Sequence, residues 1–214
     1  VYDLLEGTVT FSWEGQEETA ARGDCFHEGA VLLHVPRNTA VTITCSRDAE
    51  IAVARTENSR MFPPKLMRPE DCLCANEERG AGQMNECSTR LVRTFFDRSN
   101  CPETNFFIGE VVHYPGKWSS YPPHRHVEPE MYYYKFLPEN GYGLAEYGEN
   151  AYKVKHNDLT GMPENVTHSQ AAAPGYAEYY LWCIRLQDDK DIITTNVPEY
   201  QWVTAPEAKY FPEI

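Results

Sequence analysis

Short apolar segments that alternate with polar residues constrain the fold of this chain more than any other feature. In the first of them, Val9, Phe11 and Trp13 alternate with polar residues, which is typical of a strand with one buried face. The pair Glu14-Gly15 then marks a turn. No long stretch has the 3.6-residue period of an amphipathic helix. Short strands separated by Gly, Pro, Asn and Asp predict an all-β sandwich or barrel.

The composition indicates which partners the protein can have and which cellular compartment suits it. The 214 residues suffice for one large or two small domains, and the net charge is −13, from 19 basic and 32 acidic side chains. With no basic stripe to offset this charge, we expect no nucleic-acid partner. No apolar run is long enough for a membrane helix, so we expect no membrane partner. The seven cysteines, an odd number at irregular spacing, indicate reduced thiols and a cytoplasmic protein.

A segment of different composition separates two blocks of expected strands. It carries Pro63-Pro64 and Gly80-Ala81-Gly82, and it predicts a linker with irregular structure, apart from one strand near 89–96. In the first block we expect a strand from Val1 to Phe11, with an alternating segment over 8–13, and further strands over 30–35, 41–44 and 51–54. In the second block we expect strands over 106–114, 119–126, 130–137, 142–147, 151–155, 159–162, 166–173 and 177–186. We therefore expect two barrels joined by a linker over 61–105. The first barrel, residues 1–60, has no metal site and lacks its opening strands. The second, residues 106–214, has a metal site and a C-terminal tail.

The second block contains a set of metal-ligand residue types. In the segment His124-Arg125-His126-Val127-Glu128-Pro129-Glu130, the residues His124, His126 and Glu130 share the parity that points strand side chains to one face. His168 would join them from another strand. Three imidazoles and one carboxylate suit one divalent ion such as zinc, manganese or iron. The ligands carry one negative charge in total, so the bound ion would remain a Lewis acid.

Several residues near these ligands are candidates for proton transfer. If Glu130 points inward, so do Tyr132 and Tyr134, whose hydroxyls can bond a polyhydroxy ligand or serve as packing. Glu128 is a third candidate for moving a proton. Arg185 can pair with a substrate carboxylate, and Tyr179 shares its parity, although the sequence does not say which face is inside.

The remaining histidines have no partner at ligand spacing. We expect His27 and His34, in the first block, to be structural, because neither has a partner at ligand spacing. His113 and His156 could act behind the ligands or transfer protons, but we expect them on the surface.

Longer segments resemble one family. The run Pro115–His126 resembles the PGGNWSSYPPHKHD segment of bacterial 5-deoxy-glucuronate isomerases, and Ala171–Trp182 resembles their AAPGYxxYYLW stretch. Glu130–Tyr133 matches their ExYY, and Leu5–Val9 resembles a signature of their first barrel. Residues 157–168 resemble the second cupin motif, with asparagine at both glycine places. The resemblance covers most of the chain.

This resemblance implies a fold, an activity and a ligand set. It implies a bicupin, with two β-barrel or jelly-roll domains, that converts 5-deoxy-glucuronate to 2-deoxy-5-keto-gluconate in myo-inositol catabolism. It also implies metal ligands at His124, His126, Glu130 and His168, and a small sugar acid as the partner. Exposed barrel faces often pair, so a homodimer is one expected assembly.

Other functions stay open at the level of the sequence. A related isomerase acting on 4-deoxy-5-keto-uronate shares the ligand plan, although the run Trp118–Tyr121 argues against it. Val127 replaces the family's Asp, and Ser169 stands where the family has Pro, which keeps open a metal-holding cupin that binds a sugar acid without converting it. A cupin dioxygenase is a further alternative, because glutamate serves as the fourth ligand there too.

Overall fold

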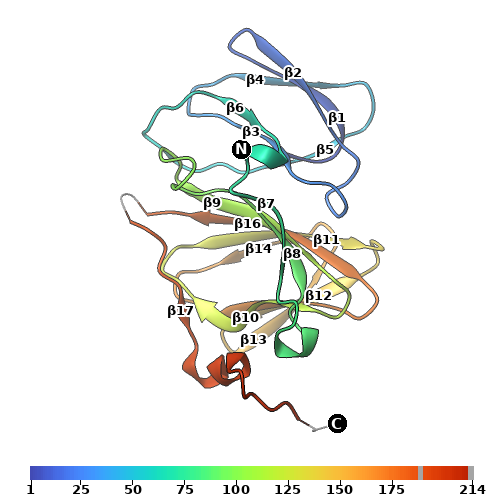
Figure 1. Cartoon of the computed structure of the whole chain (residues 1–214). Helices are drawn as coiled ribbons and strands as arrows, with labels where there is room; N and C mark the ends of the chain where they lie inside the picture. Colours follow the sequence, from blue (N-terminus) through green and yellow to red (C-terminus); the bar gives the residue numbers. More distant parts are fainter. Residues whose placement is uncertain (188–189, 212–214) are drawn as a thin grey trace. The chain divides into compact units, whose positions relative to one another are not determined.

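The computed structural model describes residues 1–187 and 190–211, which form strands and short 3-10 helices. The expected all-β class is therefore confirmed. The chain divides into two compact units, of which unit 1 comprises Val1–Glu77 and Arg93–Gly109, and unit 2 comprises Glu78–Val92 and Glu110–Ile214 (Figure 1). The described cysteines are all free thiols.

Unit 1 is organised around the long strand β1 (Tyr2–Trp13), which changes partners along its length. Its first half pairs with β3 (Val31–His34) and β5 (Glu50–Val53), and its second half pairs with β2 (Gln16–Arg22) and β4 (Val41–Cys45). The strand β6 (Lys65–Met67) extends this sheet beyond β3. Gly7 stands at the change of partners with a φ of +104°, where a Cβ would lie 2.8 Å from that of Ala49, so only glycine fits without strain. The buried side chains of β1, such as Leu4 and Phe11, form the core.

The segment 61–105 is more regular than the linker that we expected. It contains β6, β7 (Cys74–Arg79), β8 (Arg90–Phe96) and the 3-10 helices η1 (Pro69–Asp71) and η2 (Met84–Glu86). One reason is Arg93, which is 2% exposed and donates hydrogen bonds to the carbonyl oxygen of Cys25 (2.8 Å) and to Asn76 Oδ1 (3.1 Å). A buried guanidinium needs several acceptors, so it orders the chain around it.

Unit 2 draws on two sheets. One has the order β13-β12-β15-β10-β17 and the other the order β14-β11-β16-β9-β8-β7. The new strands are β9 (Phe106–His113), β10 (Trp118–Arg125), β11 (Glu130–Leu137), β12 (Tyr142–Tyr147), β13 (Asn150–Lys155), β14 (Leu159–Met162), β15 (His168–Ala172), β16 (Ala177–Arg185) and β17 (Thr195–Asn196). The eight strands that the second block predicts are thus all present.

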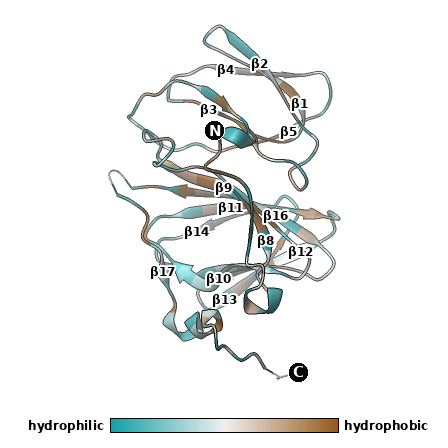
Figure 2. Cartoon of the chain, in the orientation of Figure 1, coloured by the Kyte–Doolittle hydropathy of each residue, from teal (hydrophilic) through white to brown (hydrophobic). Residues whose placement is uncertain are grey.

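Side chains from the two sheets meet inside unit 2. The hydroxyl of Tyr134 on β11 donates to Gln170 Oε1 on β15 (3.0 Å), and Ser119 Oγ on β10 lies 2.7 Å from the hydroxyl of Tyr180 on β16. The strand β9 is mostly apolar and buried along nearly its whole length (Figure 2). The interior therefore combines apolar side chains with polar groups from both sheets. These polar groups bond one another, as buried polar groups must.

The end of the chain returns to β10. The strand β17 pairs with it, with Asn196 opposite His124, and the 3-10 helix η3 (Pro198–Thr204) follows. The tail therefore lies beside the strand that carries the first candidate ligand. No helix among the described residues has the length and apolarity to cross a membrane.

Candidate metal centre

The four expected ligands come from three neighbouring strand ends. His124 lies on β10 opposite His168 at the start of β15, His126 follows the end of β10, and Glu130 begins β11. One ring nitrogen from each of the three histidines lies within 4.8 Å of the others. Glu130 Oε2 lies 3.0 Å from His126 Nε2 and 3.5 Å from His168 Nε2. The four donors therefore converge.

Backbone acceptors fix the orientation of two imidazoles. The Nδ1 atom of His126 lies 2.8 Å from the carbonyl oxygen of Glu128, and that of His168 lies 3.0 Å from the carbonyl oxygen of Val166. A carbonyl oxygen can only accept, so both Nδ1 atoms donate, and the Nε2 of a neutral His168 then presents a lone pair. The Nε2 of His168 is buried and has no hydrogen-bond partner. Such outer hydrogen bonds are what orients metal-binding histidines.

Burial controls the protonation of the cluster. Burial, with a smaller contribution from the neighbouring histidines, lowers the pKa of His124 to about 4 and that of His168 to about 3. Burial also acts to lower the pKa of His126, but the hydrogen bond and charge of Glu130 outweigh it and raise that pKa. Burial raises the pKa of Glu130. At neutral pH, His124 and His168 are uncharged and free to donate lone pairs.

This arrangement fits a divalent first-row metal ion. Three imidazoles and one carboxylate are a common donor set for such ions, and neutral imidazoles need lose no proton to bind. The unpartnered Nε2 of His168 is an unsatisfied buried group, which is costly unless something occupies the space before it. A cation at the shared centre would satisfy that lone pair and also the Glu130 carboxylate.

Comparison with models of protein families identifies the family of this chain. The model of the KduI/IolB family matches residues 2–203. The chain belongs to the KduI/IolB family. The expected relationship to 5-deoxy-glucuronate isomerases is confirmed by sequence. The chain is 29% identical to the 5-deoxy-glucuronate isomerase of Geobacillus kaustophilus, covering 94% of this chain and 76% of the relative, and 26% identical to that of Bacillus subtilis, covering 80% and 66%.

Solved structures support the fold of this KduI/IolB family member. An IolB-like protein from Salmonella typhimurium has a TM-score of 0.80 at 22% identity, over 95% of this chain and 81% of that one. A putative glyoxylate-induced protein from Pseudomonas aeruginosa has a TM-score of 0.57 at 12% identity, over 90% of this chain and 68% of that one. At these identities the likeness concerns the fold alone.

The three expected proton-transfer residues have different surroundings in this KduI/IolB protein. Tyr132 is fully buried, and its hydroxyl donates a hydrogen bond to Glu130. The hydroxyl of Tyr134 donates to Gln170. Glu128 is 4% exposed, and its Oε2 has no hydrogen-bond partner and lies 3.9 Å from His126 Nδ1. Glu128 therefore stands behind His126, whereas Tyr132 holds Glu130.

The two expected substrate-binding residues lie on the other face of β16. Ile184 is opposite Glu130 and Tyr180 is opposite Tyr134, so alternation turns Tyr179 and Arg185 away from the cluster. The hydroxyl of Tyr179 donates to Glu110 Oε2 at 2.9 Å, and an Arg185 guanidinium nitrogen lies 3.1 Å from the Leu186 carbonyl oxygen. This geometry does not support their binding a ligand held at the four donors. The sequence indicated that they share a face, but it could not identify the inner face.

The histidines outside the cluster differ in burial. His27 is exposed beside Asp24, and His156 is partly buried near Glu139. His113 is fully buried, with Nδ1 3.4 Å from Glu178 Oε1, so the expectation of a surface position was wrong. His113 lies on β9, which is apolar at most positions, so the sequence showed no alternation that would identify the buried face.

Sequence reasoning missed a chain of hydroxyl groups beside the cluster. Tyr147, which pairs with His168 across β12 and β15, donates to Thr160 Oγ1. Thr160 in turn lies 3.3 Å from the hydroxyl of Tyr134. A pocket of about 600 Å³ lined by Tyr147, Thr160 and Val166 opens between β13 and β14. Alternation along 142–147 puts Tyr147 with Gly143 and Ala145, but no sequence signal gives its partner.

Proposed function

We propose that this protein is a metal-dependent aldose–ketose isomerase that converts 5-deoxy-glucuronate to 2-deoxy-5-keto-gluconate in myo-inositol catabolism. The observation that carries the proposal is the convergence of His124, His126, Glu130 and His168 in a member of the KduI/IolB family. Relatives that align with most of the chain are named 5-deoxy-glucuronate isomerase, which supports this substrate.

The four donors would hold one divalent ion, which we propose to be zinc, manganese or iron. Such an ion supplies Lewis-acid polarisation of a carbonyl group. The chain's own residues prepare this site. Tyr132 donates to Glu130 and so keeps one carboxylate oxygen engaged, and the Glu128 and Val166 carbonyl oxygens hold two imidazoles in one tautomer.

The isomerisation moves a proton between two neighbouring carbons, so it needs a group that can take and return that proton. The hydroxyls of Tyr132 and Tyr134 already donate to other side chains, which favours positioning roles for both. The hydroxyl of Tyr147, which lines the adjacent pocket, likewise donates to Thr160 Oγ1. Glu128 keeps an unpartnered carboxylate oxygen beside His126, so we propose Glu128 as the group to test for proton transfer.

The test is direct conversion. Purified protein loaded in turn with zinc, manganese or iron is incubated with 5-deoxy-glucuronate, and the ketose is followed by proton NMR in D2O, which also reports exchange at the carbon beside the carbonyl. We expect conversion with at least one ion and none with His168→Ala protein. Absence of both conversion and exchange with every ion would overturn the proposal.

A parallel arm with 4-deoxy-5-keto-uronate identifies the substrate. Conversion of that compound alone would replace the proposed substrate and keep the isomerase class. Binding of the sugar acids by calorimetry without any exchange would instead indicate a metal-holding binding protein.

A further inference from the structure

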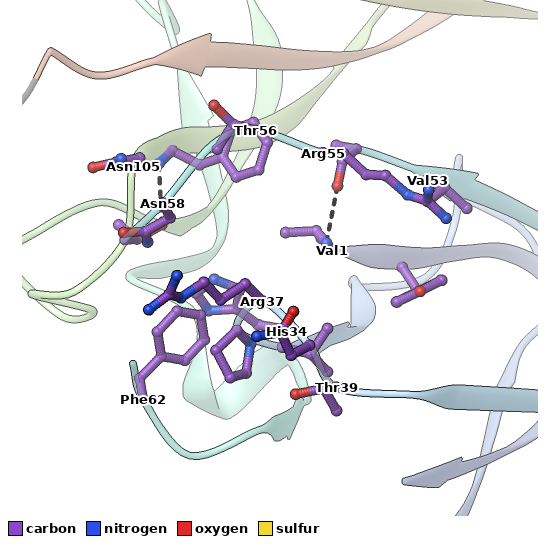
Figure 3. A pocket seen from close by; sticks show the side chains of 17 residues that line it. Val1, His34, Arg37, Thr39, Val53, Arg55, Thr56, Asn58, Phe62 and Asn105 are labelled. Carbon is purple, nitrogen blue, oxygen red and sulfur yellow. Dashed lines mark hydrogen bonds between the residues drawn. The ribbon is translucent and has the colours of Figure 1, made fainter. Parts of the chain in front are cut away.

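Unit 1 contains a pocket of its own, of about 360 Å³, apart from the candidate metal centre (Figure 3). It lies where β3 ends at His34 and β5 ends at Val53, and the chain near Thr104 closes it. Its volume is within the range of small-molecule sites. The side chains around it, rather than its size, suggest what it binds.

One polar side chain in this pocket is buried without a hydrogen bond. His34 is 7% exposed, and its ring lies between Phe96, at 4.3 Å between centroids and stacked, and Phe62, at 4.4 Å. Neither ring nitrogen makes a hydrogen bond to a residue that the structure describes. Burial lowers the pKa of His34 to about 3, so the ring is neutral at pH 7. A neutral, clamped imidazole of this kind can serve a ligand as donor or acceptor.

The charge of the pocket is opposite to that of the chain. Two arginines, Arg37 and Arg55, are among its lining residues, and no aspartate or glutamate is. The whole chain carries a net charge of −13. Figure 3 shows Arg37 beside Phe62 and Arg55 on the other side of the pocket, near Val53. Neither arginine has an ion pair or hydrogen bond to the described part of the chain, so both guanidinium groups remain available.

The polar rim of the pocket is held in place. Asn58 Nδ2 donates to the carbonyl oxygen of Glu103 at 2.7 Å, and Asn105 Nδ2 donates to that of Glu57 at 2.9 Å. Arg60 then donates to Asn105 Oδ1 at 3.0 Å. These bonds tie two loops together, so a ligand would not have to order them on binding.

We propose that the unit 1 pocket binds a small organic anion through Arg37, Arg55 and His34. Guanidinium groups pair with carboxylate or phosphate oxygens through charge-assisted hydrogen bonds. The imidazole of His34 would bond a hydroxyl or oxyanion of the same ligand. This site does not depend on the isomerase activity, because all of its residues belong to unit 1.

The test uses chelator-treated protein, so that no anion binds through a metal ion. Calorimetric titrations at low ionic strength use glucuronate as the carboxylate, glucose 6-phosphate as the phosphate and glucose as a neutral probe. We expect at least one anion to bind and glucose not to bind. The comparison of the two anions decides which acid group the site prefers. Failure of both anions to bind at millimolar concentration would overturn the proposal.

Three substitutions locate any binding. Arg37→Gln and Arg55→Gln should each weaken anion binding roughly tenfold, the effect of losing one charge-assisted hydrogen bond. Arg47→Gln removes an exposed arginine that does not line the pocket, so it should change binding less than about twofold because distant charges are screened. Equal binding by all three variants would overturn the proposal. If a variant fails to fold, the imidazole NMR signals of His34 in the unchanged protein decide, since they must shift on anion binding.

Discussion

The Nε2 atom of His126 lies 3.0 Å from the Oε2 atom of Glu130, and this contact joins the chain after β10 to the start of β11. The same oxygen lies 3.5 Å from His168 Nε2. All three side chains are buried, so none of these charges or lone pairs can be solvated by bulk water. A cation among them would offset the cost of burying the carboxylate, which is why this contact leads to predictions about metal binding.

Removing one imidazole should remove the metal. His168→Ala deletes a buried ligand whose Nε2 has no other partner, so we expect metal content to fall from about one ion per chain to near zero. The measurement is elemental analysis of purified protein after dialysis. His27→Ala is the matched control, because His27 is an exposed histidine outside the cluster. Equal metal content in the two variants would contradict the proposed ligand role.

The hydroxyl of Tyr132 should tune metal affinity without being a ligand. Tyr132→Phe keeps the buried ring but removes the donor to Glu130, and loss of such an outer hydrogen bond lowers metal affinity about ten- to a hundredfold. Affinity is measured by competition with a chromophoric chelator. Tyr133→Phe is the control, since the next residue faces away and its hydroxyl bonds Asn157 Oδ1. Unchanged affinity in Tyr132→Phe would mean that the hydroxyl does not orient Glu130.

Strand positions in the second block could be predicted because the alternation is strong there. The eight expected strands end within two residues of the observed ones. The strand β2 was missed because its first four residues are polar and exposed, so it has no alternation to detect. The strand β7 was missed for the same reason, because only its first residue is partly buried. Both strands form because they pair with a neighbouring strand, β1 or β8, and such tertiary pairing leaves no pattern within the strand itself.

The site was partly predictable for a similar reason. Parity and spacing predicted that His124, His126 and Glu130 point to one face, and in the structure His126 Nε2 lies 3.0 Å from Glu130 Oε2. The same parity argument could not say which face of β16 is inside, and alternation turns Arg185 away from the cluster. Tyr147 was missed because its partner Thr160 is on a strand beyond the hairpin, and periodicity within one strand carries no information about such contacts.

Acid should destabilise the metal-free protein through its buried histidines. His34, His124 and His168 have pKa values of about 3, 4 and 3, against about 6.5 in an unfolded chain. Between about pH 4 and 6.5 the unfolded state therefore binds more protons, so the free energy of unfolding rises with pH and falls on acidification through that window.

A substitution at His34 tests this pH dependence away from the metal centre. The contribution of one such histidine is at most about 1.4 kcal/mol per pH unit. We expect the pH dependence of the unfolding free energy to be shallower in His34→Gln than in the unchanged protein between pH 6 and 5. Urea denaturation at several pH values measures both. Parallel curves for the two proteins would show that His34 is not kept neutral by the fold.

A glycine inside unit 2 should resist the smallest enlargement. A Cβ added at Gly143 on β12 would overlap the carboxylate of Glu178 and lie 2.9 Å from the carbonyl oxygen of Ala171. Glu178 is fully buried and 3.4 Å from His113, so its carboxylate cannot move out to water. We therefore expect Gly143→Ala to lower the free energy of unfolding by roughly 1–3 kcal/mol, as overpacked cores do.

The control for this substitution lies in the other sheet of the same unit. A Cβ at Gly161 on β14 would meet no atom within 4 Å, so Gly161→Ala changes the backbone freedom equally but adds no clash. It should leave the unfolding free energy unchanged or slightly higher. Urea denaturation with an unchanged slope in both variants makes the comparison valid. If Gly143→Ala matches Gly161→Ala in stability, the Glu178 carboxylate does not lie against β12, and the buried pair with His113 must be arranged differently.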